Sequence, residues 1–560
     1  MDGQMTVTGG KLLVDCLLAN GIDRAYGVPG ESYLAVLDAL RDAPIALTIS
    51  RQEGGAAMMA DADARLTGRP GICFVTRGPG ATNAAAGIHI AMQDSVPLIV
   101  FIGQVERSFL EREAFQEIDY THFFQPITKW AAEIRDPARI PEYVNRAFAI
   151  ATSGRPGPVV LSLPEDMLSE RVATPRLLPF TPVEPQIGLG DLAALRRLLA
   201  GAKNPIAILG GSGWSQLASD RMARFAEKWQ LPVMVSFRRQ HLFDHLHPCF
   251  AGHIGIGIDQ ALRARIDASD VILLIGGKMS EMPSQSYTLF AVPNPTQTLI
   301  HVHAGAEEIG KVYRPALGVV SAPGPLAAAL DGLEPPIGEP AWAGTAKAAH
   351  DAYLAFSDAP APIPGKVQMR EVMETVRNSV PADTIIANGA GNFAGWPNRF
   401  YRYRRYGTQL APTSGSMGYG LPAAVAAKLR HPERTVLCFA GDGDLQMTIQ
   451  ELGTAAQYGA SIIVLVIDNG LYGTIRMHQE REYPGRPHGS DIVNPDFAVI
   501  AKAYGMAGFT VRATADFKPA FAAALTSPKG ALIHIVIDPE AITPTTTLSK
   551  IREASLAARS

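Results

Sequence analysis

Two oxygen-bearing side chains stand at the ends of strand-like runs in the C-terminal part of the chain. Asp442 follows the apolar run 435–440 (TVLCFA), and Asn469 closes the run 461–468 (SIIVLVID), with one helical stretch between them. Parallel strands joined by one helical crossover lie close together, and their carboxyl ends share one sheet edge. A carboxylate and an amide oxygen are hard ligands, which suit Mg²⁺ when phosphate completes its shell. The pair therefore predicts a magnesium site that also takes a phosphate.

Glycines beside Asp442 favour the same interpretation. Gly441 and Gly443 let backbone amides approach a phosphate, and the helix that follows offers its N-terminus. An ordinary strand–turn–helix, with Asp444 as the N-cap and Asn469–Gly470 as a turn, explains either segment alone. It does not explain why both oxygens end strands on the two sides of one crossover, so the metal site is the favoured hypothesis.

The segment from GDG (441–443) to DN (468–469) resembles the signature of thiamine diphosphate enzymes, with Asp468 where that family usually has Asn. The resemblance implies that Mg²⁺ is bound by the side chains of Asp442 and Asn469 and by the carbonyl of Leu471. The residues implied around the diphosphate and its immediate surroundings are Gly389, Ala390, Gly391, Gly443, Asp444, Tyr472 and Gly473.

A further segment, TSGSMGYGLPAA (413–424), resembles the part of these enzymes that grips the middle of the cofactor. By this resemblance the carbonyl of Gly415 accepts a hydrogen bond from the aminopyrimidine, and Met417 bends the cofactor into a V shape. A methionine is more often a core filler, and only its place among these glycines favours the functional role.

Glu53 follows the apolar run 45–50 (IALTIS) and precedes a helical stretch. Alone it is a glutamate that the helix dipole favours. Its context resembles the pyrimidine-binding domain of the same family, which implies that Glu53 binds the aminopyrimidine nitrogen and favours the tautomer that takes a proton from the thiazolium carbon. The other residues implied around cofactor and substrate are Gly30, Pro79, Asn83, Phe115 and Gln116.

Short apolar runs alternate with helical stretches along most of the chain, which predicts an α/β fold of parallel sheets covered by helices on both faces. The predicted strands are 71–76, 97–103, 158–163, 205–210, 270–276, 298–303, 384–388, 435–440, 461–468 and 531–538. Two proline-rich stretches, 174–185 and about 333–364, are interpreted as linkers, the second enclosing a predicted helix over 342–357. They separate a pyrimidine-binding domain (1–175), a central Rossmann-like domain (186–335) and a diphosphate- and magnesium-binding domain (365–545).

The resemblance covers nearly the whole chain and is closest to the large, catalytic subunit of acetolactate synthase, through GPGATN (78–83), AFQEID (114–119), PITKW (126–130) and GRPGPVVLSLPED (154–166). It implies a transferase that decarboxylates a 2-oxoacid and joins the acyl unit to a second carbonyl. A lyase that acts as a simple decarboxylase or acyloin lyase stays open, as does a non-catalytic binding protein. In this family two subunits share each active site, which implies a homodimer or homotetramer.

Several positions depart from the acetolactate synthase pattern. Glu165 replaces the lysine of its PKD segment, Met282 falls on an arginine, and His478 falls on a tryptophan. These groups engage substrate or flavin in that family. The inverted charge at residue 165 should therefore change how an anionic substrate binds. The donor, the acceptor and the presence of FAD in the central domain are therefore left open. A nicotinamide cofactor is disfavoured, because Gln216 breaks the GxGxxG pattern that begins at Gly211.

Bulk properties exclude several other classes. The 560 residues carry a net charge of −3, which gives no basic face for nucleic acid or a membrane surface. Apolar runs stay below the roughly 18 residues of a membrane span, and the N-terminus lacks a secretory pattern. The four cysteines match no metal spacing and are expected to be buried thiols in a reducing cytoplasm: Cys16, Cys73, Cys249 and Cys438.

Overall fold

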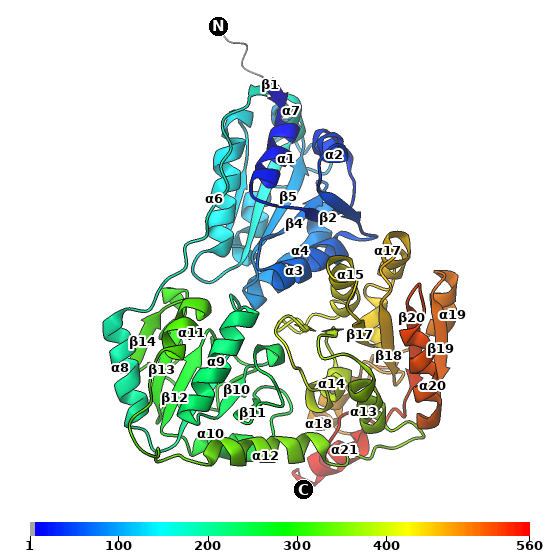
Figure 1. Ribbon diagram of the computed structural model, residues 1–560. Coiled ribbons are helices and arrows are strands. Elements are labelled where there is room, and N and C mark those ends of the chain that lie inside the picture. The colour runs from blue at the N-terminus through cyan, green and yellow to red at the C-terminus, as the bar shows by residue number, and fades with distance from the viewer. Residues whose placement is uncertain (1–5, 560) are drawn as a thin grey trace. The chain divides into compact units, whose positions relative to one another are not determined.

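The computed structural model describes residues 6–559 and contains three six-stranded parallel sheets (Figure 1). Contacts group the chain into two compact units. Unit 1 comprises Met1–Val183, Val425–Arg430 and Gln450–Tyr458, and unit 2 comprises the rest. The predicted α/β class with three helix-flanked parallel sheets is confirmed. The residue boundaries of the three domains stay predictions.

The N-terminal sheet belongs to unit 1 and has the strand order β3-β2-β4-β5-β7-β6. Its strands are β2 (Arg24–Gly27), β3 (Ala46–Ile49), β4 (Gly71–Val75), β5 (Leu98–Gln104), β6 (Trp130–Glu133) and β7 (Pro158–Pro164). Four helices share one core on one face: α1 (Gly9–Ala19), α2 (Leu34–Arg41), α6 (Ile140–Thr152) and α7 (Glu165–Ser169). The helices α3 (Glu53–Thr67) and α4 (Pro79–Asp94) pack against each other across the sheet from that core (Figure 1). The remaining elements are α5 (Tyr120–Phe124) and an antiparallel pair of β1 (Thr6–Thr8) with β8 (Arg171–Ala173).

The central sheet, in unit 2, has the order β11-β10-β9-β12-β13-β14. Its strands are β9 (Pro205–Leu209), β10 (Val233–Val235), β11 (Phe250–His253), β12 (Val271–Ile275), β13 (Thr298–His303) and β14 (Leu317–Val320). Alternate residues of β9 and β12 enter two separate cores, one on each face, as expected for strands with period-two side chains. The helices are α8 (Leu189–Ala200), α9 (Gln216–Trp229), α10 (Gln260–Asp267), α11 (Pro323–Asp331) and α12 (Thr345–Asp358).

The C-terminal sheet has the order β16-β15-β17-β18-β20-β19. Its strands are β15 (Ile385–Asn388), β16 (Gln409–Leu410), β17 (Val436–Gly441), β18 (Ile463–Asp468), β19 (Ala507–Val511) and β20 (Ala531–Val536). Because β17 and β18 are neighbours, the residues that follow them share one sheet edge, as the spacing predicts. The helices are α13 (Met369–Ser379), α14 (Gly395–Phe400), α15 (Gly420–Arg430), α16 (Asp442–Gln446), α17 (Glu451–Tyr458), α18 (Gly473–Glu482), α19 (Phe497–Ala503), α20 (Thr514–Leu525) and α21 (Leu548–Ala557).

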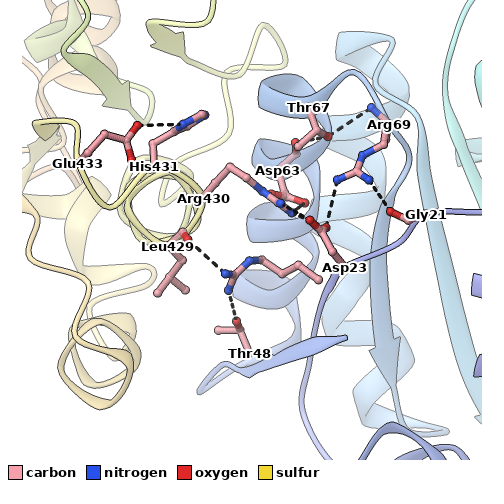
Figure 2. A network of polar contacts seen from close by, with 11 residues as sticks. Gly21, Asp23, Thr48, Asp63, Thr67, Arg69, Leu429, Arg430, His431 and Glu433 are labelled. Atoms are coloured by element: carbon pink, nitrogen blue, oxygen red, sulfur yellow. Dashed lines mark hydrogen bonds and ion pairs between the residues drawn. The ribbon is translucent and has the colours of Figure 1, made fainter. Parts of the chain in front are cut away.

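Two short pieces of the C-terminal sequence, the end of α15 and all of α17, belong to unit 1. Figure 2 shows Arg430, the last residue of α15, between two carboxylates. Its Nε lies 2.7 Å from Oδ1 of Asp63 on α3, and its Nη1 lies 2.9 Å from Oδ2 of Asp23. Arg24 adds a 3.2 Å hydrogen bond from its Nη2 to the carbonyl of Leu429. The end of α15 is thus tied to α3 and to the residues around the start of β2.

Replacing Arg430 by Ala is expected to destabilise unit 1 by about 3–5 kcal/mol, because the buried Asp63 loses its cation. The measurement is the midpoint of the first unfolding transition in urea. Lys347→Ala is the control, since Lys347 makes an exposed ion pair with Asp351 within one helix. That change should cost less than about 1 kcal/mol. Equal losses in the two variants would refute a structural role for the Arg430 cluster.

Within residues 6–559, no helix is both long and apolar enough to cross a membrane. All four cysteines are free and buried, as predicted. Burial raises the pKa of Cys16 to about 12, so this thiol stays protonated and unreactive near neutral pH.

Candidate cofactor and metal site

Three side chains meet where β17 and β18 end. Asp442 follows β17, Asp468 closes β18, and Asn494 comes from the irregular segment before α19. The Nδ2 of Asn494 donates to Oδ2 of Asp442 at 2.7 Å and to Oδ1 of Asp468 at 2.8 Å. The two carboxylates and the amide of Asn494 give this edge of the sheet several oxygen atoms within a short range. Asn494 was not predicted, because no motif marks the segment that carries it.

The turn after β18 lies directly against Asp442. The N–H of Gly470 donates to Oδ2 of Asp442 at 3.0 Å, and the N–H of Leu471 donates to Oδ1 of Asn469 at 3.3 Å. The three predicted metal residues, Asp442, Asn469 and Leu471, are therefore brought to one edge. In the described part of the chain no three His, Cys, Asp or Glu side chains cluster for a metal. A cation here needs amide, carbonyl and phosphate oxygens, which is the ligand set of Mg²⁺.

The electrostatics of Asp442 and Asp468 fit a site that binds a cation. Burial raises the pKa of Asp442, and the nearby charge of Asp468 raises it further. Burial acts in the same direction on Asp468, but the 2.7 Å contact with His534 and the hydrogen bond from the Gly470 N–H act together against it, and the pKa of that carboxyl is lowered. A bound divalent cation would favour the ionised form of both acids. The residues present therefore fit a magnesium ion.

At several glycines in the loops beside this edge, the surrounding atoms leave no room for a side chain. A Cβ on Gly389 would lie 2.0 Å from Oδ1 of Asp444, and one on Gly443 would lie 2.8 Å from the ring of Tyr472. Gly391 has a φ of +154°, and Gly473 begins α18. Close approach of bare backbone to an anion requires such glycines. The glycines among the predicted diphosphate residues thus let loop backbone pack closely around the start of α16, and their contact with a diphosphate stays a prediction.

The side chain of Asp444 joins two loops rather than capping a helix. It is not an N-cap, because α16 begins at Asp442 and Gly441 precedes it. Its Oδ1 accepts from the N–H groups of Ala390 and Gly418, both at 2.9 Å, and the side chain is buried. The carboxylate therefore joins the 389–391 loop to the loop that carries Gly415 and Met417. The contact of Asp444 with a diphosphate stays a prediction.

The buried Asp444 predicts a specific pH dependence. Burial raises its pKa to about 7, against the hydrogen bonds from Gly418 and Ala390. An unfolded Asp titrates near 3.9, so the stabilisation from the protonated form is complete below that pH and is lost as pH rises through about 7. Asp444→Asn keeps an acceptor without the charge. Its melting temperature relative to the wild type, without metal or cofactor, should rise between pH 5.5 and pH 8.

The exposed Asp351 gives the control for this comparison, because its carboxylate lies on the surface of α12. The melting temperature of Asp351→Asn relative to the wild type should change little over the same pH range. A constant difference between Asp444→Asn and the wild type would show that the Asp444 carboxyl is not protonated in the folded chain at pH 5.5.

Glu53 is the first residue of α3, and its side chain is half-buried. Its Oε2 accepts a hydrogen bond from Nδ2 of Asn83 at 2.9 Å. A Cβ on Gly80 would lie 3.5 Å from its Oε1, so the Pro79–Gly80 start of α4 runs beside the carboxylate. The predicted residues Glu53, Pro79 and Asn83 thus form one group within unit 1.

The other predicted residues of unit 1 lie on adjoining loops. A Cβ on Gly30 would meet Thr76 at 2.2 Å, and one on Gly78 would meet Cβ of Gln116 at 2.6 Å. Gln116 has a φ of +65°, a left-handed conformation that is uncommon for a residue with a side chain and clusters at functional sites. Phe115 differs from the rest, because its side chain is 74% exposed and only its backbone carbonyl is engaged, by Arg77.

Arg77 precedes the 78–80 turn and was not predicted. Its side chain is only 9% exposed, and it pairs with Glu31 at 2.5 Å and with Glu165 at 3.3 Å. Burial raises the pKa of Glu165, and Arg77 opposes that shift. The charge inversion noted at Glu165 is therefore not isolated, since a cation from another loop pairs with it. In the sequence, Arg77 is marked only by its position directly before the GPG turn.

Comparisons with known proteins agree with this geometry. Three family models match: the thiamine pyrophosphate enzyme N-terminal TPP binding domain over residues 7–123, the central domain over 192–330, and the C-terminal TPP binding domain over 389–535. The chain is 33% identical to the acetolactate synthase large subunit of Parasynechococcus marenigrum (strain WH8102), over 95% of this chain and 87% of that protein.

Two further relatives extend the likeness to other organisms. The probable acetolactate synthase large subunit of Methanocaldococcus jannaschii is 31% identical, over 96% of this chain and 93% of that protein. The acetolactate synthase isozyme 2 large subunit of Escherichia coli (strain K12) is 28% identical, over 95% of this chain and 96% of that protein. These matches span all three sheets, and the chain therefore belongs to the thiamine pyrophosphate enzyme family.

Proposed function

We propose that this chain is a thiamine diphosphate-dependent carboligase that decarboxylates a 2-oxoacid and joins the acyl unit to a second carbonyl compound. The observation that carries the proposal is the likeness, over 95% of the chain, to a relative named acetolactate synthase large subunit. The group formed by Glu53 and Asn83 and the sheet edge at Asp442 support it, because they are the acid–base and metal-binding parts that such chemistry needs.

Each part of the chain has a role in this proposal. Asp442, Asn469 and the carbonyl of Leu471 would hold Mg²⁺, and the glycine-lined loops would receive the diphosphate. Glu53 would hold a proton at the aminopyrimidine nitrogen, with Asn83 orienting its carboxylate. Gly415 and Met417 would grip the cofactor between its two rings. When bound, the cofactor supplies the electron sink for breaking and forming the carbon–carbon bond.

The active unit in this proposal is a homodimer or homotetramer in which two subunits complete each site. The family resemblance supports this proposal. Mixing Glu53→Gln with Asp442→Ala subunits provides the test. Recovery of activity in the mixture of two inactive variants is the expected result, and lack of recovery despite subunit exchange argues against shared sites.

Product analysis tests the carboligase directly. The protein is incubated with Mg²⁺, thiamine diphosphate and a panel of 2-oxoacids, each alone and with a neutral aldehyde, and the products are identified by mass spectrometry. A coupled hydroxy-ketone or hydroxy-oxoacid is expected, and free aldehyde as the sole product refutes carboligation. A visible spectrum of the purified protein decides whether FAD is bound.

A simple 2-oxoacid decarboxylase is the second candidate, and the Arg77 cluster favours it. The guanidinium of Arg77 is already neutralised by Glu31 and Glu165, so it is not free to bind the carboxylate of a second oxoacid. In the same product panel, this candidate predicts free aldehyde even when a coupling partner is present in excess.

A further inference from the structure

Glu451 is a fully buried glutamate that the metal and cofactor site does not use. It is the first residue of α17 and is 0% exposed. Each of its carboxylate oxygens lies 3.2 Å from the backbone nitrogen of Arg51, and its Oε2 also accepts from the hydroxyl of Thr454 at 2.6 Å. A buried carboxylate is retained at little cost only when donors surround it, and here the main donor is a backbone amide two residues before Glu53.

The helix that carries Glu451 holds the connection between β3 and α3 at three points. The hydroxyl of Tyr458 accepts from the N–H of Ile49 at 2.8 Å, Glu451 accepts from the N–H of Arg51, and Oε1 of Gln457 accepts from Nη2 of Arg51 at 2.6 Å. All of these residues belong to unit 1. The backbone that leads into Glu53 is therefore held by α17 rather than by its own sheet alone.

A glycine on α3 makes this contact possible. A Cβ on Gly55 would lie 2.6 Å from Oε1 of Glu451, too close unless the carboxylate moves. At the other end of the same helix, Arg430 binds Asp63 (Figure 2). Two elements of the C-terminal sequence thus hold α3, one at the residues that precede Glu53 and one near its last turn.

We propose that Glu451 is a positioning residue for Glu53, which sets the carboxylate of Glu53 by fixing the backbone of Arg51. The inference rests on the proposed function, in which Glu53 exchanges a proton with the aminopyrimidine nitrogen. A displacement of about 1 Å in a catalytic group costs on the order of 100-fold in rate. Loss of the Glu451 contact should slow proton transfer much more than it weakens cofactor binding, because Glu451 lies outside the diphosphate and metal loops.

Two variants disturb the same contact from opposite sides. Glu451→Gln removes the charge, and Gly55→Ala pushes the carboxylate from the Arg51 amide while leaving its charge in place. The readout is hydrogen–deuterium exchange at C2 of bound thiamine diphosphate, with Mg²⁺ and without substrate. Both variants should slow this exchange at least tenfold, keep the dissociation constant of the cofactor within threefold, and increase amide exchange in residues 49–55.

Glu480→Gln is the matched control, because Glu480 is also 0% exposed and accepts a backbone N–H, that of Gly485 at 2.9 Å. Its C2 exchange should stay within twofold of the wild type. Unchanged C2 exchange in a folded Glu451→Gln or Gly55→Ala protein overturns the inference, as does an equal slowing in Glu480→Gln. If Glu451→Gln does not fold, Gly55→Ala alone decides, since alanine is favoured within a helix. Wild-type protein that binds the cofactor without accelerating C2 exchange would instead refute the proposed function.

Discussion

Replacing Asp442 by Ala is expected to abolish magnesium-dependent binding of thiamine diphosphate. Asp442 is the predicted metal ligand that carries a carboxylate, and the N–H of Gly470 in the turn 469–471 donates to its Oδ2 at 3.0 Å. Removal of residues that merely support a metal ligand costs about 10–100-fold in metal affinity, so loss of a ligand itself should cost more than about 100-fold. Titration calorimetry of the cofactor with and without Mg²⁺ measures this directly.

The fold of Asp442→Ala should survive, since the burial that raises the pKa of Asp442 shows that its charge is unfavourable without a cation. Asp491→Asn is the control, because the side chain of Asp491 is 77% exposed and its carboxylate pairs with Arg476. That variant should bind the cofactor within about twofold of the wild type, since a surface carboxylate contributes little. Magnesium-dependent binding retained by Asp442→Ala would contradict the assignment of the metal site.

The second large effect is expected for Glu53→Gln, which should lower turnover by about 10²–10⁴-fold, the usual contribution of acid–base catalysis. The amide keeps an oxygen for the hydrogen bond from Asn83, so the local structure should be preserved. It cannot accept and return a proton near neutral pH. Cofactor affinity should change only a few-fold, because the predicted metal and diphosphate ligands are left unchanged.

Steady-state kinetics at saturating cofactor measure this effect. Glu142→Gln is the control, because Glu142 is an exposed residue of α6 in the same unit. Its turnover should equal that of the wild type. If Glu53→Gln kept more than about a tenth of wild-type turnover, Glu53 could not be the residue that exchanges the proton.

The interior strands could be predicted from the sequence, because strands buried on both faces are continuous apolar runs. All ten predicted runs contain strands, among them β5, β12 and β18. Strands such as β6 and β16 were not predicted. The residues of β6 are half-buried, and β16 has only two residues. Their pairing depends on a neighbouring strand rather than on their own pattern, so the sequence around them carries little signal.

Some residues of the candidate site could likewise be predicted from the sequence, and others could not. Asp442 and Asn469 could be placed together because one crossover joins their strands, a local rule of parallel sheets. Asn494, Arg77 and Glu451 could not be found, because each acts on a segment 26 or more positions away along the chain. The N-cap considered for Asp444 is wrong for a related reason: two distant backbone amides take its carboxylate. The roles of these residues depend on burial and on partners that are distant along the chain.

The account rests on the activation of thiamine diphosphate by this chain, and the rate of C2 hydrogen exchange of the cofactor tests it most directly. The wild-type protein is mixed with Mg²⁺ and thiamine diphosphate in D₂O, quenched with acid and measured by NMR. We expect exchange at least about 100-fold faster than in the free cofactor, and a rate near the free value in Glu53→Gln. Bound cofactor that exchanges no faster than free cofactor in the wild-type protein would contradict the account.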